Sequence, residues 1–258
     1  MNTQTTKNAT RYCFYIDKNL NVMKKEITFH WFSGFSKEQK NRSIHSFLDT
    51  TAQQFNIDRN KILEICKLSP NSLGQQLSAF NLLLTLKNNQ NQAITANVER
   101  FFQGAKVFGK KDDIFSDDKI GAFEEIIIDK SLHPKRYQPL ANVLNEVKNG
   151  KLQMIAFQLF GQDYPLNPKN FFYDYLYITA LIQNKKLSEQ LLAYEYFSDI
   201  EFNPKKAINC QAKSAAIYVS MLKKGIVQDF IEQDNDGLEK LNKEKFLQEY
   251  QNSIFIER

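Results

Sequence analysis

A carboxylate, an amide and a primary amine recur at helical spacing between residues 97 and 108. An α-helix advances about 100° per residue, so Glu99, Gln103 and Lys106, at i, i+4 and i+7, fall on one narrow stripe. A carboxylate beside an amine is sufficient for acid–base catalysis and for a Schiff base. The same spacing is typical of the solvated face of an amphipathic helix, so the stripe alone leaves both interpretations open. The opposite side of the predicted helix is apolar: Val98, Phe101, Phe102, Ala105 and Phe108.

The elements that must position this stripe follow from the turn and capping residues. The runs 11–16 and 21–31 are rich in β-formers around Asp17-Lys18-Asn19, which predicts a hairpin. Ser36 followed by Gln39 predicts a capped helix ending near residue 55, and Asn97 can cap the helix of the stripe. Further strands are predicted at 61–68 and 151–160, and helices at 139–148, 171–183, 187–196 and 212–222. The predicted fold is α+β, predominantly helical, with a small N-terminal sheet.

Composition narrows the class of protein. The 258 residues are 42% hydrophobic with a net charge of +5, and no run approaches the ~18 apolar residues of a membrane span. The N-terminus lacks the apolar region of a secretory signal. Cys13, Cys66 and Cys210 are odd in number and widely spaced, and only three histidines accompany them, which argues against a disulfide framework and against a Cys/His metal site. We expect a cytoplasmic protein with no metal and no cofactor, whose mild basicity permits contact with a polyanion without requiring it.

Several segments beside the stripe together resemble a known family. They are residues 31–40, the Leu-Ser-Ala-Phe-Asn of 77–81, the aromatic run 172–177, Asp199-Ile200-Glu201, and the Phe-Asn-Pro-Lys-Lys-Ala-Ile-Asn-Cys-Gln-Ala of 202–212. With Glu-x-x-x-Gln-x-x-Lys they resemble the NADAR superfamily, also called YbiA-like, and within it the antitoxins linked to DarT toxins. The resemblance spans roughly residues 28–225. Residues 109–140 depart from it as a divergent insert, and 229–258 form a charged tail expected to be helical, all within one domain of residues 1–258.

The resemblance implies an enzyme that removes ADP-ribose from guanine bases in DNA, as antitoxin to a DarT-type ADP-ribosyltransferase. Lys106 would attack the ribose carbon and form a Schiff base, and neighbouring phenylalanines would lower its pKa by desolvation. Glu99 would protonate the departing base and later activate water. The implied partners are ADP-ribosylated DNA and the toxin, with Lys205, Lys206 and Lys213 as candidates for phosphate contacts and with no membrane. The implied substrate-binding residues are Trp31, Asn81, Phe102, Gln103, Asp174, Asp199, Glu201, Asn209 and Gln211, of which Asp199 and Glu201 share one face if their segment is extended.

Two other functions stay open at this point. One is a non-catalytic module that binds ADP-ribose or the toxin. The other is an N-glycosidase for a small N-ribosyl metabolite, as in YbiA-like proteins. Intact Glu99 and Lys106 favour an enzyme over a scaffold, whereas nothing in the residues ranks DNA against a small substrate.

Overall fold

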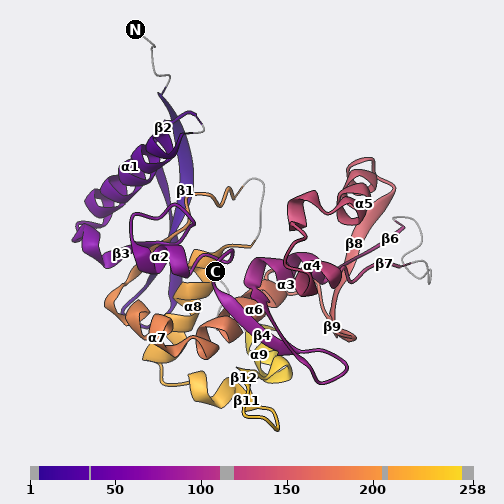
Figure 1. Ribbon diagram of the computed structural model, residues 1–258. Helices are drawn as coiled ribbons and strands as arrows, with labels where there is room; N and C mark the ends of the chain where they lie inside the picture. The colour runs from indigo at the N-terminus through magenta and orange to yellow at the C-terminus, as the bar shows by residue number, and fades with distance from the viewer. Residues whose placement is uncertain (1–5, 35, 111–118, 205–208, 252–258) are drawn as a thin grey trace. The chain divides into compact units, whose positions relative to one another are not determined.

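The computed structural model describes residues 6–34, 36–110, 119–204 and 209–251 (Figure 1). The chain forms two compact units. Unit 1 consists of residues 1–82 and 177–258, and unit 2 of residues 83–176. Helix exceeds strand among the described residues, and the sheets are small, so the predicted α+β class is confirmed. The assignment of the whole chain to one domain stays a prediction.

The N-terminal hairpin of unit 1 forms as predicted. Strands β1 (Thr6–Ile16) and β2 (Val22–Phe32) pair antiparallel over their whole length. Asp17 shapes the turn, because its Oδ1 accepts hydrogen bonds from the backbone N–H groups of Asn19 and Asn21. Helix α1 (Lys37–Phe55) lies alongside the hairpin (Figure 1) and begins at Ser36, whose hydroxyl accepts from the N–H of Gln39 as the capping box predicts.

Two short strands complete the sheet of unit 1, in the order β2-β1-β10-β3. Strand β10 (Tyr196–Ser198) runs antiparallel to β1 and parallel to β3 (Ile62–Glu64). The predicted helix over 187–196 is therefore wrong at its end, since pairing on both sides holds residues 196–198 extended and buries Phe197 completely. The strand predicted over 61–68 is shorter in the structure, where β3 comprises three residues. The core of this sheet and α1 contains Cys13, Ile27, Phe29, Ile44, Phe47, Leu48, Ile62, Cys66 and Ile200.

The rest of unit 1 is mainly helical. Helix α8 (Gln211–Lys223) is buried along most of its length and contacts β1 and β10. Helix α6 (Phe171–Gln183) begins in unit 2 and ends in unit 1, and its bounds match the prediction. The remaining short elements are η1 (Arg59–Lys61), α2 (Ser72–Gln76), α7 (Lys185–Ser188), η3 (Glu189–Ala193) and η4 (Val227–Phe230).

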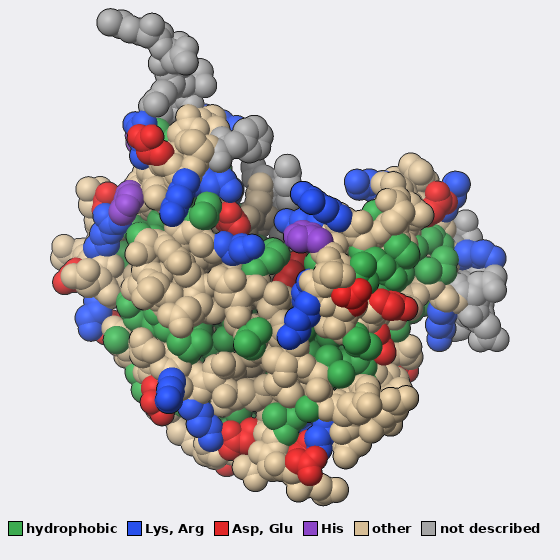
Figure 2. All heavy atoms as spheres, viewed as in Figure 1, with side chains coloured by type: hydrophobic (Ala, Val, Ile, Leu, Met, Phe, Trp, Pro, Cys, Tyr) green, Lys and Arg blue, Asp and Glu red, His purple; other side chains and the backbone are tan. Residues whose placement is uncertain are grey.

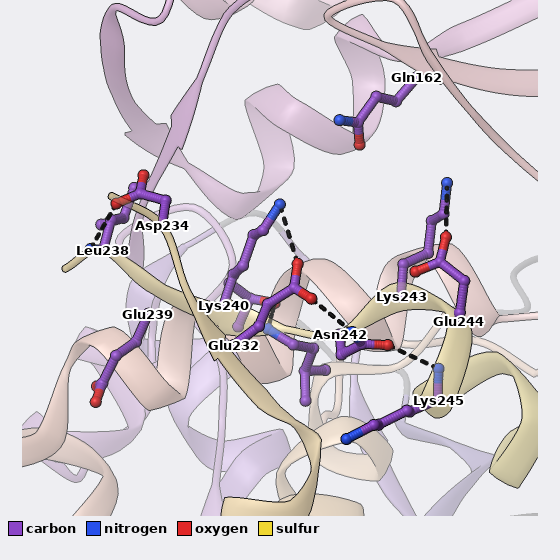
Figure 3. A network of polar contacts seen from close by, with 12 residues as sticks. Gln162, Glu232, Asp234, Leu238, Glu239, Lys240, Asn242, Lys243, Glu244 and Lys245 are labelled. Carbon is purple, nitrogen blue, oxygen red and sulfur yellow. Dashed lines mark hydrogen bonds and ion pairs between the residues drawn. The ribbon is translucent and has the colours of Figure 1, made fainter. Parts of the chain in front are cut away.

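The charged tail is a hairpin followed by a helix, so the wholly helical prediction is wrong. Strands β11 (Ile231–Gln233) and β12 (Glu239–Leu241) pair antiparallel before α9 (Lys243–Gln251). Asp234 turns the chain between them by accepting from the N–H groups of Asp236 and Leu238. Figure 3 shows Glu232 between Lys240, at 3.2 Å, and the Asn242 amide, at 2.6 Å. Polar side chains thus tie the hairpin to the start of α9.

Unit 2 contains a hairpin and a four-stranded antiparallel sheet. The hairpin is β4 (Leu83–Lys87) with β5 (Ala93–Asn97). The sheet has the order β7-β6-β8-β9, from β6 (Lys106–Lys110), β7 (Ile120–Gly121), β8 (Leu152–Leu159) and β9 (Gln162–Tyr164). The helices are α3 (Val98–Gly104), α4 (Glu125–Ile128), η2 (Pro134–Arg136) and α5 (Gln138–Lys148).

Helix α5 lies beside β8 (Figure 1), and its apolar residues meet those of the sheet and of α4. The buried members of this core are Phe108, Phe123, Ile126, Leu140 and Val143. The predicted divergent insert therefore contributes core residues to unit 2. Its residues 111–118 lie outside the described part of the chain.

Candidate active site

Helix α3 carries the first two residues of the predicted stripe and ends before the third. Asn97 caps it as predicted, because its side-chain oxygen accepts from the N–H of Arg100 at 3.0 Å. The helix ends at Gly104, where α4 lies so close that a Cβ would stand 2.7 Å from Cγ1 of Ile127. The prediction that the helix continues through Lys106 is wrong, since Lys106 is the first residue of β6.

The backbone of Lys106 is held on two sides. Lys106 pairs with Phe157 of β8, and the preceding carbonyl, that of Ala105, accepts from the N–H of Gln158 at 2.7 Å. On the other side the Lys106 carbonyl accepts from the N–H of Ala122 at 3.1 Å. The amine of Lys106 therefore projects from a fixed point, and only its side-chain torsions remain to place it.

Three polar side chains form a chain of hydrogen bonds across the junction between α3 and β6. Lys106 Nζ donates to Gln103 Oε1 at 2.7 Å, and Gln103 Nε2 donates to Glu99 Oε1 at 2.9 Å. We call this the Glu99–Gln103–Lys106 relay. The three residues of the predicted stripe therefore do lie together. Lys106 is not part of α3, but the turn after Gly104 places its side chain on the same side as Glu99 and Gln103.

An aromatic ring lies beside the amine end of the relay and packs against further rings. Lys106 Nζ lies 5.0 Å from the centroid of the Phe102 ring, a cation–π distance. Phe102 in turn packs against Phe157, with centroids 5.4 Å apart, and edge-on against Tyr173 at 5.2 Å. Sequence reasoning identified Phe102 but missed Phe157, because a β8 residue gains this place only through its register with Lys106.

Burial moves both ends of the relay toward their neutral forms. Desolvation raises the pKa of Glu99, against the opposing effects of the Gln103 hydrogen bond and of the charges on Lys106 and Lys135. Desolvation also lowers the pKa of Lys106, against the charge of Glu99. Because desolvation is the largest cause for each group, the pair favours a protonated carboxyl beside a neutral amine more than free side chains do.

Asp174 is the remaining predicted site residue of unit 2. It lies in the first turn of α6 and is completely buried. Its role in substrate binding stays a prediction.

Asp199 and Glu201 lie in unit 1, in a turn that follows β10. Asp199 Oδ1 accepts from the backbone N–H groups of Glu201, at 3.1 Å, and Phe202, at 3.2 Å. The segment is not extended, so the two carboxylates do not share a strand face. Asp199 is buried, whereas Glu201 is exposed and forms an ion pair with Lys40 at 3.8 Å.

The predicted amides of unit 1 mostly bind the chain itself. Gln211 is buried, and its Oε1 accepts from the N–H of Ala79 while its Nε2 donates to the carbonyl of Ile65, each at 2.7 Å. Both ends of this amide are therefore used in joining three segments. Asn81 Nδ2 donates to the carbonyl of Gln75 at 2.7 Å, and Asn209 is half-buried just before α8.

Trp31, a predicted substrate-binding residue, is half-buried on β2. Its ring packs edge-on against Phe29 with centroids 6.2 Å apart, and Arg11 Cζ lies 5.3 Å from its centroid. Arg11 Nε also donates to the carbonyl of Ile200 at 2.7 Å. A guanidinium thus sits between the only tryptophan and the turn that holds Asp199.

Sequence reasoning missed a second buried carboxylate in unit 1. Glu64 ends β3 and is almost completely buried, and it accepts from the Ser198 hydroxyl and from the Ile200 N–H, the latter at 2.9 Å. We call Glu64, Ser198 and Asp199 the Glu64–Asp199 cluster. Desolvation raises the pKa of both carboxyls. The signal was present in the sequence, as one carboxylate inside the apolar run Ile-Leu-Glu-Ile-Cys of 62–66.

Two other kinds of site were sought within the described part of the chain. His, Cys, Asp and Glu side chains there do not gather in groups of three or more that could hold a metal ion. None of the helices there is long and apolar enough to span a bilayer.

The family model of the DarT1-associated NADAR antitoxin matches residues 9–251. The chain belongs to the DarT1-associated NADAR antitoxin family. The NADAR match begins earlier and ends later than the span of motif resemblance, and it contains the relay, the Glu64–Asp199 cluster and the hairpin of the tail. Membership confirms the predicted resemblance and the role of a DarT-associated antitoxin, for which a DarT toxin is the indicated partner. Comparison with curated proteins gives no match.

Proposed function

We propose that this NADAR antitoxin is an N-glycosidase that removes ADP-ribose from guanine bases in DNA. The observation that carries the proposal is the Glu99–Gln103–Lys106 relay, in which a carboxyl group and an amine are desolvated together and linked through one amide. The family membership supports the antitoxin setting, in which the product of a DarT-type transferase is the natural substrate.

The first step is attack of the neutral Lys106 amine on the ribose carbon that bears the base. The new bond joins Nζ to that carbon, and the bond from the carbon to the guanine nitrogen breaks. Glu99 gives its proton to the departing nitrogen, so that guanine leaves neutral. Positive charge develops on the ribose carbon and ring oxygen in the transition state, and the carboxylate that remains stabilises it.

The second step frees the enzyme. The ring C–O bond opens to a protonated Schiff base between Lys106 and the sugar carbon, and the proton that the lysine nitrogen loses converts the ring oxygen into a hydroxyl group. Glu99, now ionised, takes a proton from water as the water oxygen adds to that carbon. Collapse of the adduct breaks the carbon–Nζ bond, returns the amine of Lys106 and releases ADP-ribose with a reducing end.

The directions of the two pKa shifts suit this sequence. An ordinary lysine amine is almost fully protonated at neutral pH and cannot attack. Burial lowers the pKa of Lys106 and raises the pKa of Glu99, so that the nucleophile is more often neutral and the acid more often protonated. Fixing the Lys106 backbone between β8 and Ala122 limits the motion needed to bring the amine to the carbon.

Trapping the Schiff base tests the proposal. Borohydride added during turnover of a guanine-ADP-ribosylated oligonucleotide should reduce the C=N bond to a stable amine and leave the mass of reduced ADP-ribose on the peptide that carries Lys106. The matched control is borohydride with unmodified oligonucleotide, which should leave the peptide unchanged. Turnover without an adduct, or an adduct on another residue, contradicts the assigned nucleophile, and binding without turnover favours a non-catalytic module.

Salt dependence separates DNA from a small N-ribosyl substrate. Lys and Arg side chains are scattered over the face seen in Figure 2, among Asp and Glu, so we expect a few phosphate contacts rather than many. Each contact gives a salt slope of roughly −0.7 for single strands, so affinity for the modified oligonucleotide should fall more between low and physiological salt than affinity for ADP-ribose. Lys213 of α8 is the described candidate for such a contact, while Lys205 and Lys206 lie outside the described residues. Equal slopes for the two ligands favour a small substrate.

A further inference from the structure

We propose that Gln103 is a positioning residue that keeps the Lys106 amine out of a direct ion pair with Glu99. The inference rests on the proposed function, because it assigns a task to the middle member of the same relay. The sequence predicts that Gln103 binds the substrate. In the structure, the two ends of its amide instead form hydrogen bonds with the two groups proposed to react, Glu99 and Lys106.

The amide has one orientation that fits its neighbours. A lysine ammonium only donates, so the amide must face it with its oxygen, and this turns the NH2 group toward Glu99. Gln103 Oε1 lies 2.7 Å from Lys106 Nζ, and Gln103 Nε2 lies 2.9 Å from Glu99 Oε1. The amide thus lies between the two groups. Its oxygen accepts a hydrogen bond from the Lys106 amine, and its NH2 group donates one to the Glu99 carboxyl.

A direct pair would oppose the chemistry. A carboxylate in hydrogen-bond contact with an ammonium stabilises the ionised forms of both, and in a site of low dielectric this attraction is large. The nucleophile would stay protonated and the acid would stay ionised. An amide spacer supplies hydrogen bonds from a neutral dipole, so desolvation remains the largest influence on both groups.

The other charged groups nearby do not replace Gln103. Lys135 of η2 is a positive charge that lowers the pKa of Glu99. Arg100 of α3 is engaged elsewhere, because its guanidinium donates to the backbone carbonyls of Ile126, Asp129 and Lys130. Glu99 is the charged group whose field acts on the pKa of Lys106. The balance at the amine is therefore set between desolvation, Glu99 and the amide that separates them.

A cycle of variants read at Lys106 itself tests the inference without relying on turnover. The pH dependence of Lys106 acetylation by acetic anhydride, measured by mass spectrometry against exposed Lys151, gives the midpoint at which the amine becomes neutral. The midpoint is compared between wild type, Glu99→Gln, Gln103→Leu and the double variant. Gln92→Leu is the matched control, since that exposed amide also lies in unit 2 and its oxygen accepts from Asn88 in the turn between β4 and β5.

With Gln103 in place, Glu99→Gln should lower the Lys106 midpoint only slightly. In the Gln103→Leu background the lysine and the carboxylate can meet, so the midpoint should start higher, and Glu99→Gln should then lower it by about one pH unit or more. Gln92→Leu should leave the midpoint unchanged. Two results would overturn the inference. One is an equally small shift of the Lys106 midpoint on Glu99→Gln in wild type and in Gln103→Leu, and the other is a midpoint that Gln103→Leu leaves unchanged.

Turnover gives a second, separable measurement. Gln103→Leu should lower activity at neutral pH by about tenfold for each pH unit that the Lys106 midpoint rises, and the alkaline limb of the pH profile should move up by the same amount. A purely structural role predicts a loss of activity without a shift of that limb. If Lys106 is not trapped by borohydride, the proposed function fails whatever the acetylation shows. If Lys106 is trapped while the cycle shows no coupling, only the role of Gln103 fails.

Discussion

Glu64 of unit 1 is almost completely buried and Glu99 of unit 2 is half-buried, and burial raises the pKa of each. They differ in what binds them. Glu64 accepts from the Ser198 hydroxyl and the Ile200 N–H, whereas Glu99 accepts from a side-chain amide that leads to an amine. A raised pKa is therefore common to both carboxyls, and the identity of the hydrogen-bond donors distinguishes them.

The difference also appears in how each carboxylate holds the chain. Glu64 joins the end of β3 to the turn after β10, and Arg11 of β1 reaches the same turn through the carbonyl of Ile200. Asp199 closes the turn with two backbone N–H donors. Such groups stabilise one arrangement of three strands. Among the described residues, the donor to the Glu99 carboxyl is the Gln103 side chain, so Glu99→Gln leaves backbone hydrogen bonds intact.

The largest expected effect is loss of activity on changing Lys106. Lys106→Ala removes the nucleophile, and Lys106→Arg replaces it with a guanidinium that stays protonated, so each should lower kcat by about 10⁴-fold or more. The melting temperature should change little, because the anchoring hydrogen bonds of Lys106 are made by its backbone. The release of ADP-ribose from a modified oligonucleotide measures kcat, and thermal unfolding measures the melting temperature. Substantial activity in either variant contradicts a Schiff base at Lys106.

The same substitution at the two carboxylates sharpens the comparison directly. Glu99→Gln should lower kcat by about 10²–10⁴-fold, the usual value of a positioned proton transfer, with little change in melting temperature. Glu64→Gln should lower the free energy of unfolding by about 1 kcal/mol, since an NH2 group then faces one of its two donors, and should leave kcat within a few-fold. Both readings come from one set of activity and unfolding measurements.

A reversal of these outcomes would end the distinction between the two sites. If Glu99→Gln unfolds the protein while activity per folded molecule persists, Glu99 is structural. If Glu64→Gln abolishes turnover without altering the melting temperature, the Glu64–Asp199 cluster belongs to the chemistry. The matched change keeps side-chain size constant, so differences in packing do not explain either result.

The pH dependence should also differ between the two sites. The proposed mechanism requires a neutral Lys106 and a protonated Glu99, and burial moves their pKa values toward each other from the ordinary 10.5 and 4.5. We expect a bell-shaped kcat/KM with both apparent pKa values inside that interval and belonging to the pair. Glu99→Gln should remove one limb, and two unchanged limbs contradict the assignment.

At Glu64 the pH should act on stability instead. The folded state holds this proton more tightly than the unfolded state, whose carboxyl has the ordinary pKa near 4.5. The contribution of Glu64 is therefore fully present below that pH and is lost as the pH rises through the folded pKa. The free energy of unfolding of wild type minus that of Glu64→Gln should fall with rising pH. A difference independent of pH shows that the Glu64 carboxyl is not perturbed.

Local signals in the sequence were sufficient for much of the fold. The Asp17 turn, the Ser36 capping box and the Asn97 cap each act within four residues, and the structure confirms all three. The helix predictions fail at Tyr196 and in the tail after Asp229, because the strands found there form only with partners distant in sequence or across a turn. Helical propensity is a weak prior where a sheet offers partners on both sides.

The candidate site was likewise predictable only where its residues are close in sequence. Helical spacing grouped Glu99 and Gln103 correctly, but the position of Lys106 depends on Gly104, on α4 and on the pairing of β6 with β8. Phe157 and Glu64 were missed, because their neighbours come from other strands. The predicted amide Gln211 proved to be engaged with Ala79 and Ile65, a contact that sequence spacing cannot show.

The smallest expected effect concerns Glu201, the exposed carboxylate beside the Glu64–Asp199 cluster. Its ion pair with Lys40 spans 3.8 Å between side chains that are 44% and 39% exposed, and such pairs contribute about 0–1 kcal/mol. Glu201→Ala should therefore leave the melting temperature nearly unchanged. If Glu201 binds substrate, as the family motif predicts, KM should rise a few-fold at constant kcat.

Lys40→Ala is the matched control for this last experiment, because it breaks the same ion pair and keeps the carboxylate. A higher KM in Glu201→Ala together with a normal KM in Lys40→Ala assigns the effect to the carboxylate itself. Equal KM values in both variants and wild type mean that Glu201 is a surface residue and that the turn after β10 serves only to stabilise the strands. Unit 1 would then offer stability through Glu64 and Asp199, while the carboxylate chemistry would rest on Glu99 alone.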